Sequence, residues 1–306
     1  MRIVFFGTPD FAAISLKRLV DDGFDIAAVV TVADKPAGRG QKISTSPVKD
    51  YAQAVGLPIL QPLKLKDDAF LRSLQEFNAD LFVVVAFRML PKEVWAMSRL
   101  GTINLHGSLL PNYRGAAPIH HAVINGETES GCTTFFINEH IDTGNLLEQC
   151  RVAIPDEATT GEVYNELAHQ GAMLLSGTVE KLSRNAIQDI EQRLTGNEKS
   201  APKIQRDDCK INWNQPVEKI YHFVRGLSPF PCAFTSLNGE TYKIYYALRT
   251  DLPTIGPGRI QHDKKRLLVG TSDFMLEITD LQPAGKKRML VDAFSAGNNL
   301  NDQAFS

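Results

Sequence analysis

The sequence has few features of exported proteins, membrane proteins or metalloproteins. Its 306 residues include four cysteines, none of which stands in a C-x-x-C pair or beside a histidine at metal-ligand spacing. The apolar run after Met1 is shorter than a signal peptide requires, and no later run is long enough to cross a bilayer. We therefore expect a cytoplasmic protein with reduced cysteines and without a membrane segment.

The phosphate-binding glycine motif of dinucleotide enzymes is also missing. The first predicted strand ends in GTPDF at residues 7–11, which lacks the spacing G-x-G-x-x-G. A dinucleotide cofactor is therefore disfavoured. Two interpretations of this turn stay open: it is a tight turn that starts a helix, or it lines a substrate site.

The first part of the chain alternates short apolar runs with amphipathic segments, a pattern typical of β-α-β units. Strands are predicted at residues 2–6, 26–32 and 81–86, and helices at residues 11–20, 48–54 and 69–77, with Asp10 and Asp67 as N-caps. The pattern predicts an α/β fold with a doubly wound, mostly parallel sheet.

The pattern changes toward the C-terminus. Two more strands at residues 132–137 and 146–154 and a long helix at 160–182 complete a first domain over residues 1–188, and a polar stretch at 189–208 is predicted to be a linker. A helix at 217–227 and strand-like runs at 234–237, 242–247, 258–261, 266–270 and 274–280 follow. Residues 209–306 are therefore predicted to form a small β-rich domain, a five-stranded barrel of the oligonucleotide-binding (OB) type.

Asn104 and His106 alternate on a short predicted strand, so their side chains project from the same face. Ligands bind at the carboxyl ends of such strands in open α/β sheets. An amide and an imidazole at one point can stabilise the negative charge that forms on a carbonyl oxygen during acyl transfer. Taken alone, the pair is also compatible with a buried Asn and His bonded to their neighbours, and Asp142-Thr143-Gly144 is compatible with a plain turn.

Longer motifs surround these residues. The segment NLHGSLLPNYRGAAP at residues 104–118, followed by IDTG at 141–144, resembles the signature of the methionyl-tRNA formyltransferase family. The resemblance includes DKPAGRGQK at 34–42, SPVK at 46–49 and LQPAGKK at 281–287, and so covers nearly the whole chain. It implies a formyltransferase domain joined to a barrel-like domain. It also implies an enzyme that transfers the formyl group of 10-formyltetrahydrofolate to methionine on the initiator tRNA, without a metal.

The resemblance assigns catalysis to Asn104, His106 and Asp142. The formyl donor is an amide, so the barrier lies in forming a tetrahedral oxyanion, to which Asn104 and His106 would donate hydrogen bonds. Asp142 would orient the imidazole and relay the proton of the attacking amine through a water molecule.

The resemblance also indicates where the folate binds. The expected residues are Phe87, Arg88, Met89, Ser108, Leu109, Leu110 and Pro111. The family usually has Tyr-Gly at positions 87 and 88, so this chain departs from it and the pterin pocket is expected to be lined differently. Alternatively, Phe87 packs in the core.

Two basic segments are expected to contact tRNA. The loop at residues 34–49 carries Lys35, Arg39, Lys42 and Lys49, and in the family this insertion grips the acceptor arm. Residues 201–306 hold 14 Lys/Arg against 11 Asp/Glu, whereas residues 1–200 hold 19 against 24. Within that basic part, Lys286, Lys287 and Arg288 are the expected phosphate contacts. Solvated loops without a ligand are the alternative for both segments.

Two other functions remain compatible with these motifs. One is a formyltransferase that acts on an amino-sugar nucleotide, and the other is a non-catalytic protein that binds tRNA or folate. The basic loop and the basic C-terminal part disfavour the first, because a small sugar nucleotide requires neither. We expect the protein to act on initiator methionyl-tRNA as a monomer.

Overall fold

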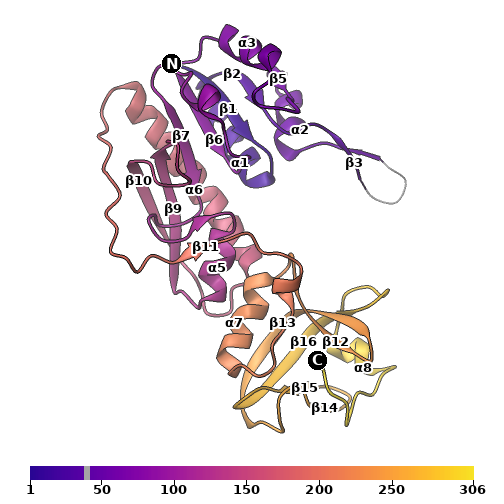
Figure 1. Ribbon diagram of the computed structural model, residues 1–306. Helices are drawn as coiled ribbons and strands as arrows, with labels where there is room; N and C mark the ends of the chain where they lie inside the picture. Colours follow the sequence, from indigo (N-terminus) through magenta and orange to yellow (C-terminus); the bar gives the residue numbers. More distant parts are fainter. Residues whose placement is uncertain (38–41) are drawn as a thin grey trace. The chain divides into compact units, whose positions relative to one another are not determined.

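A computed structural model of the chain describes the backbone of residues 1–37 and 42–306 and the side chains of residues 1–35 and 44–306. The chain forms two compact units (Figure 1). The first unit contains residues 1–115, 130–152 and 164–200, and the second contains residues 116–129, 153–163 and 201–306. No helix in these described ranges combines the length and the apolar character needed to span a bilayer.

The first unit is built on a seven-stranded sheet with the order β10-β9-β7-β6-β1-β2-β5. Its strands are β1 (Arg2–Gly7), β2 (Asp25–Val30), β5 (Ile59–Leu60), β6 (Leu81–Val85), β7 (Thr102–His106), β9 (Glu129–Phe136) and β10 (Leu146–Ala153). The chain starts at β1 near the middle and adds parallel strands on both sides, while β9 pairs antiparallel to β7. The predicted doubly wound, mostly parallel sheet is confirmed.

Helices cover both faces of this sheet. They are α1 (Asp10–Asp21), α2 (Pro47–Ala54), α3 (Asp68–Glu76), α4 (Lys92–Trp95) and α6 (Thr160–Ser183). Helices α3 and α4 pack on one face, where Leu74 and Val94 join the core formed by Phe6 and Phe82. The predicted cap at Asp67 is confirmed, since its carboxylate accepts hydrogen bonds from two backbone amides of the first turn. The predicted cap at Asp10 is wrong.

The cap position of α1 is taken by Pro9, and Asp10 is the first residue of the helix. Its carboxylate instead accepts the hydroxyl of Tyr164 at 2.5 Å and its neighbouring backbone amide at 3.1 Å. The carboxylate still carries negative charge at the positive end of the helix, although it does not occupy the cap itself.

Alternation along β7 decides which side chains reach the site. Leu105 of β7, whose register partner on β9 is Thr134, lies against Gly171 of α6, and so does Cys132 of β9. Asn104 and His106 therefore point to the opposite face, where Asn104 is paired in register with Val84 of the core under α3 and α4. The prediction that these two side chains share a face is confirmed.

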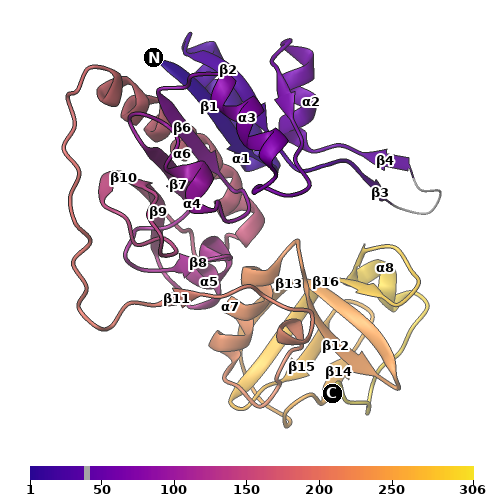
Figure 2. The same cartoon turned by 45° about the horizontal axis from the view of Figure 1, so that its top comes forward.

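The basic loop contains a short antiparallel pair, β3 (Lys35–Ala37) and β4 (Lys42–Ser44). Figure 2 shows this hairpin extending from the sheet of the first unit. A second small sheet pairs β8 (Arg114–Gly115) with β11 (Ser200–Ala201). This pairing brings the backbone at residue 114 next to the backbone at residue 200.

The second unit is β-rich, as predicted. Its antiparallel sheet follows the order β12-β13-β16-β15-β14, with β17 paired to β16. The strands are β12 (Ala233–Leu237), β13 (Glu240–Pro253), β14 (Ile260–His262), β15 (Leu267–Gly270), β16 (Phe274–Pro283) and β17 (Met289–Leu290). The helical segments are α5 (Pro118–Ile124), η1 (Asp207–Cys209), α7 (Val217–Leu227) and α8 (Val291–Ser295). Helix α7 buries Ile220, Val224 and Leu227 in the core of this sheet.

The C-terminal residues connect the two outer strands of this sheet. Ser306 and Ser236 of β12 exchange two backbone hydrogen bonds, at 2.9 and 3.2 Å. The amide of Ile260 in β14 donates to the carbonyl of Gln303 at 3.0 Å, and Arg259 bridges to Ala304. The sheet is thus continued from β12 to β14 through the tail, while the finer OB-type classification stays a prediction.

Candidate active site

The imidazole of His106, at the end of β7, is almost completely buried. Its Nε2 lies 2.8 Å from the carbonyl oxygen of Tyr113. Because a carbonyl only accepts hydrogen bonds, Nε2 carries the proton of this contact. The other ring nitrogen, Nδ1, lies 3.8 Å from Oδ2 of Asp142.

Asp142 lies in the connection between β9 and β10 and has a left-handed backbone with φ of 53°. Its side chain is 15% exposed, and Oδ2 accepts the backbone N–H of Gly115 at 2.9 Å. The separation of 3.8 Å from the imidazole is too long for a direct hydrogen bond. The structure therefore brings His106 and Asp142 together from separate segments of the first unit.

Asn104 lies two residues before His106 on the same face of β7 and is half-buried. Within residues 1–37 and 42–306, no side-chain hydrogen bond is formed by its amide. Because this half-buried amide has no hydrogen-bond partner among the described residues of the protein, it can donate to a ligand without breaking a bond that stabilises the fold. The geometry supplies a free amide, an imidazole and a carboxylate in one region of the first unit.

The loop after β7 is fixed by side chains of β9 and β10. The hydroxyl of Thr133 donates to the carbonyl of Ser108 at 2.6 Å and accepts the amide of Leu110 at 3.1 Å. Gln149 donates to the carbonyl of Leu110 at 2.9 Å. These bonds fix the backbone that presents the Tyr113 carbonyl to His106. Ser108 and Leu110 are buried, while Leu109 and Pro111 are half-buried.

The role of Thr133 in this loop was not predicted from the sequence. The register pairs Thr133 of β9 with His106 of β7, so both side chains lie on the same face of the sheet. The alternation of residues 132–137 could have indicated this placement once the strand pairing was known. Pairing partners across an antiparallel pair are not visible in one sequence.

Gln192 was also missed, because it lies in the stretch predicted to be a linker. It is only 8% exposed, and its Nε2 donates to the carbonyls of Asp142 at 3.0 Å and Gly144 at 2.8 Å. Its Oε1 accepts two hydrogen bonds from Arg114, at 3.2 Å from Nε and 2.6 Å from Nη2. Ile190, in the same stretch, bridges to Leu146 of β10.

The residues expected at the folate have mixed environments. Phe87 packs edge-on against Phe6 of the core, with 5.9 Å between ring centroids, as the alternative interpretation expected. Arg88 donates to the carbonyls of Leu63, at 2.9 Å, and Pro62. Met89 is exposed. Of these three side chains, Arg88 and Met89 are exposed, and Met89 forms no hydrogen bond within the described residues.

The basic loop differs from its expected form at one position. The ammonium group of Lys49 forms an ion pair with Asp34 and is only 13% exposed, whereas Lys35 is exposed. Arg39 lies outside the described residues, and so does the side chain of Lys42. Lys49 contributes to the local fold of the loop.

The C-terminal basic cluster divides in a similar way. Arg288 forms an ion pair with Asp280 at 2.6 Å, and its guanidinium lies 4.2 Å from the centroid of the Tyr245 ring. Lys286 and Lys287 are exposed. The charge of Arg288 is therefore used within the second unit, while the two lysines face solvent.

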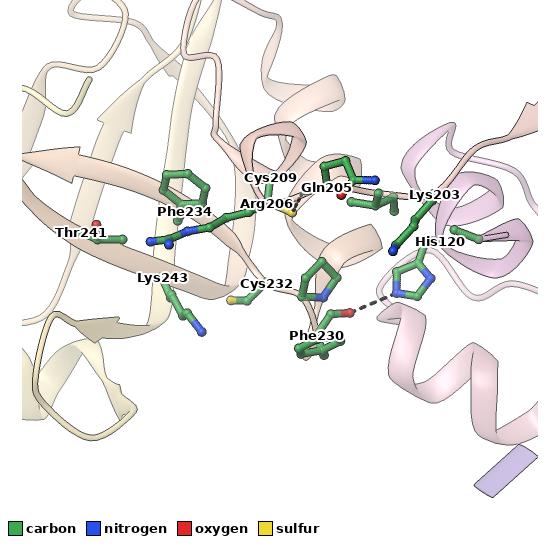
Figure 3. A pocket seen from close by; sticks show the side chains of 13 residues that line it. His120, Lys203, Gln205, Arg206, Cys209, Phe230, Cys232, Phe234, Thr241 and Lys243 are labelled. Carbon is green, nitrogen blue, oxygen red and sulfur yellow. Dashed lines mark hydrogen bonds between the residues drawn. The ribbon is translucent and has the colours of Figure 1, made fainter. Parts of the chain in front are cut away.

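The second unit also contains a cavity of about 610 Å³, which was not expected from the sequence. Lys203, Arg206 and Lys243 contribute to its lining, and Figure 3 shows Lys203 on the side of His120 and the other two on the side of Thr241. No acidic residue lines it, and no ion pair is formed by these three cations within the described part of the chain. Phe230 lies at its edge and is 78% exposed.

Two neighbouring histidines do not form a metal site. His120 donates from Nε2 to the carbonyl of Phe230 at 3.0 Å, and His121 donates to that of Pro202 at 2.9 Å. In the described residues no group of three His, Cys, Asp or Glu side chains is placed to hold a metal. These bonds tie both histidines to backbone carbonyls of the second unit.

Comparison with known proteins gives two family matches. Residues 1–179 match the formyl transferase family, and residues 203–299 match the C-terminal domain of formyl transferases. The chain is 49% identical to the methionyl-tRNA formyltransferase of Parabacteroides distasonis, over 97% of this chain and 95% of that protein. It is 47% identical to the methionyl-tRNA formyltransferase of Bacteroides fragilis, over 99% of this chain and 96% of that protein.

Solved structures share the fold at lower identity. WlaRD, a sugar 3N-formyl transferase, aligns with a TM-score of 0.67 and 21% identity over 94% of this chain and 99% of its own. HypX from Aquifex aeolicus in complex with tetrahydrofolic acid aligns with a TM-score of 0.64 and 17% identity, over 97% of this chain and 47% of its own. These similarities confirm the predicted formyltransferase fold. Because it is 47–49% identical to these relatives over nearly its whole length, the chain belongs to the methionyl-tRNA formyltransferase family.

Proposed function

We propose that this protein transfers the formyl group of 10-formyltetrahydrofolate to the α-amino group of methionine on initiator methionyl-tRNA. The observation that supports this best is the approach of His106 to Asp142, at 3.8 Å, beside the free amide of Asn104 on β7. Membership of the methionyl-tRNA formyltransferase family agrees with this chemistry. HypX, a solved structure of the same fold, binds tetrahydrofolic acid, which agrees with a folate-type formyl donor.

The proposed reaction forms one C–N bond and breaks another. The amino group of methionine attacks the formyl carbon, and the carbonyl oxygen becomes an oxyanion. Asn104 donates to this oxyanion through its amide, and His106 donates through the Nε2 proton that Tyr113 otherwise accepts. When the intermediate collapses, the bond to N10 of the folate breaks and the formyl group stays on methionine.

Asp142 accounts for the proton in this scheme. The attacking amine must lose a proton, and the N10 nitrogen of the leaving folate must gain one. Asp142 is partly accessible, and the hydrogen bond from Gly115 holds one of its oxygens beside the imidazole. It takes the proton from the amine through a water molecule and returns it to N10. No covalent intermediate on the protein is required.

The donor is proposed to lie along the loop after β6 and the loop after β7. Met89 and the half-buried Leu109 offer apolar surface there, and the fixed backbone of residues 108–111 offers amide and carbonyl groups. Arg88 is held by the carbonyls of Leu63 and Pro62. We therefore assign to Arg88 a role in shaping the pocket rather than in binding the folate charge.

The tRNA is proposed to contact several basic regions. In the first unit these are Lys35, Arg39 and Lys42 of the basic loop at residues 34–49, while Lys49 supports this loop through Asp34. In the second unit they are Lys286 and Lys287. The cations of the cavity, Lys203, Arg206 and Lys243, add positive charge, and none of the three forms an ion pair within the described residues. Unpaired cations of this kind suit phosphate groups.

A single assay compares this function with the amino-sugar alternative. The purified protein is incubated with 10-formyltetrahydrofolate and either charged initiator tRNA or a UDP-amino sugar. We expect formylmethionyl-tRNA to form and the sugar to remain unchanged. Formylation of the sugar alone would support the alternative, which the fold of WlaRD also permits. An absence of turnover with both acceptors would support a non-catalytic binding protein.

A further inference from the structure

We propose that Gln192, held by Arg114, is a positioning residue that keeps the Asp142 carboxylate beside His106. The proposal rests on the proposed function, because it concerns how the proton-transfer group of that reaction is placed. Gln192 does not touch the imidazole. Within the described residues, the hydrogen bonds of its side chain are all with the turn that carries Asp142 and with Arg114.

The turn around Asp142 has an uncommon backbone conformation. The φ of Asp142 is 53°, in the left-handed region that aspartate and asparagine adopt more readily than other non-glycine residues. Two residues later, the Cα of Gly144 packs so close to the carbonyl of Phe136 that a Cβ would meet that oxygen at 1.6 Å. Gln192 donates to the carbonyls of Asp142 and Gly144, one on each side of Thr143.

The orientation of the Gln192 amide is fixed by its partners. Its nitrogen faces two carbonyl acceptors, and its oxygen faces the guanidinium of Arg114. A flipped amide would place an oxygen against two carbonyls and a nitrogen against two donors. Gln192 is only 8% exposed, and all four hydrogen-bonding positions of its amide have partners. These four bonds are compatible with one arrangement of the turn.

Arg114 connects this contact to the Asp142 carboxylate. The side chain of Arg114 holds Gln192, and the backbone N–H of the next residue, Gly115, donates to Oδ2 of Asp142. Both residues belong to β8. This short strand therefore fixes the main chain of the turn, through Arg114 and Gln192, and also the carboxylate of Asp142, through the N–H of Gly115. Loss of the Gln192 amide leaves two carbonyls without donors and allows the carboxylate to leave its position 3.8 Å from the imidazole.

Three substitutions separate the possible roles of Gln192. Gln192→Leu removes every hydrogen bond, and Gln192→Glu keeps an acceptor for Arg114 while losing the donor to the carbonyls. Gln188→Leu is the matched control, because Gln188 is an exposed glutamine of the same segment. We expect kcat to fall about tenfold or more in both Gln192 variants, with KM for tRNA within about twofold, since a displaced catalytic group costs rate. Wild-type kcat in Gln192→Glu would overturn the proposal.

A double-mutant cycle tests whether Gln192 acts through Asp142. In an Asp142→Asn background, Gln192→Leu should cost no further kcat, because the group that it positions is already lost. A further tenfold loss would show that Gln192 supports the protein in general and would contradict the proposal.

An NMR measurement tests the inference without any turnover. The amide proton of Gly115 reports its hydrogen bond to Asp142. We expect its resonance to shift upfield and its exchange with solvent to accelerate in Gln192→Leu and Gln192→Glu, and to stay unchanged in Gln188→Leu. An unchanged Gly115 signal in the Gln192 variants would overturn the inference, even in a protein that formylates tRNA. A changed signal in a protein without turnover would instead contradict only the proposed function.

Discussion

Nδ1 of His106 faces Oδ2 of Asp142 across 3.8 Å, and both side chains are largely covered by the first unit. Each is also tied to the loop after β7: the imidazole donates to the carbonyl of Tyr113, and the carboxylate accepts the N–H of Gly115. The two functional groups are therefore placed by neighbouring backbone atoms of one loop. A substitution that moves this loop should affect both groups together.

Asp142→Asn should reduce kcat by on the order of 10²-fold, because asparagine keeps the size of the side chain and cannot take the proton of the amine. The affinity for tRNA should stay within about twofold of wild type. Single-turnover formylation and a filter-binding assay measure the two quantities. Glu139→Gln, an exposed substitution in the same connection, is the control and should behave as wild type. A kcat within threefold of wild type in Asp142→Asn would remove this carboxylate from the mechanism.

Asn104→Asp should lower kcat by on the order of 10² to 10³-fold, since it replaces the amide donor with a carboxylate at the position of the oxyanion. Asn104→Ala removes the donor without adding charge and should lose less activity than Asn104→Asp. Because the fold does not use this amide, both variants should keep the thermal unfolding midpoint of the wild type. Equal activity in the two variants and the wild type would show that the amide does not contact the oxyanion.

Local patterns in the sequence predicted most of the fold. The period of two in β7 and the apolar runs of β1 and β6 depend on residues close in sequence, and so does the capping of α3 by Asp67. Short elements such as α4 and β5 carry too few residues for a period to appear. Asp10 was misassigned because Pro9, which cannot cap with a side chain, occupies the cap position.

Partners of polar side chains could not be predicted in the same way. Gln192 meets Asp142 and Arg114 across 50 and 78 positions of sequence, and nothing near Gln192 indicates either contact. Composition likewise counts Arg288 as a free cation, although Asp280 neutralises it in the folded chain. A single sequence reveals the charge of a side chain but not the residue of opposite charge with which it forms an ion pair.

Replacing Lys203, Arg206 and Lys243 together by glutamine should weaken tRNA binding and flatten its dependence on salt. Each lost phosphate contact lowers the slope of log K against log salt by about one, so three contacts should lower it by about three. Binding is measured between low and moderate salt by fluorescence anisotropy with labelled tRNA. Arg288→Gln is the comparison and should leave the slope nearly unchanged, because its charge is paired with Asp280. An unchanged slope in the triple variant would exclude the cavity from the tRNA interface.

Arg288→Met should lower the free energy of unfolding by about 1–2 kcal/mol, since it leaves the carboxylate of Asp280 without its charged partner in a mostly buried position. Arg288 is half-exposed, so solvent screening keeps the loss at the lower end for an ion pair. Urea denaturation measures the change. Lys287→Met, at an exposed neighbouring position, should change stability by less than about 0.5 kcal/mol. Equal effects of the two substitutions would contradict the structural role of Arg288.

Cys150 should react with iodoacetamide at lower pH than the other cysteines. A hydrogen bond from the thiol of Cys132 lowers the pKa of Cys150 to about 7, while burial raises the pKa of Cys209. The rate of alkylation should therefore reach half its maximum near pH 7, and in Cys132→Ala this midpoint should move up toward that of an ordinary thiol, about 8.5. A wild-type midpoint above pH 8 would contradict the hydrogen bond.

The same shift in the pKa of Cys150 predicts how its contribution to stability depends on pH. The pKa in the folded protein lies below that of the unfolded chain, so the folded state favours the thiolate. The stabilisation is fully present above pH 9 and is lost as pH falls through 7. The difference in unfolding free energy between the wild type and Cys150→Ala should accordingly be larger at pH 9 than at pH 6.5. Urea denaturation at both pH values measures it, and a difference independent of pH would show that the thiolate is not stabilised by the fold.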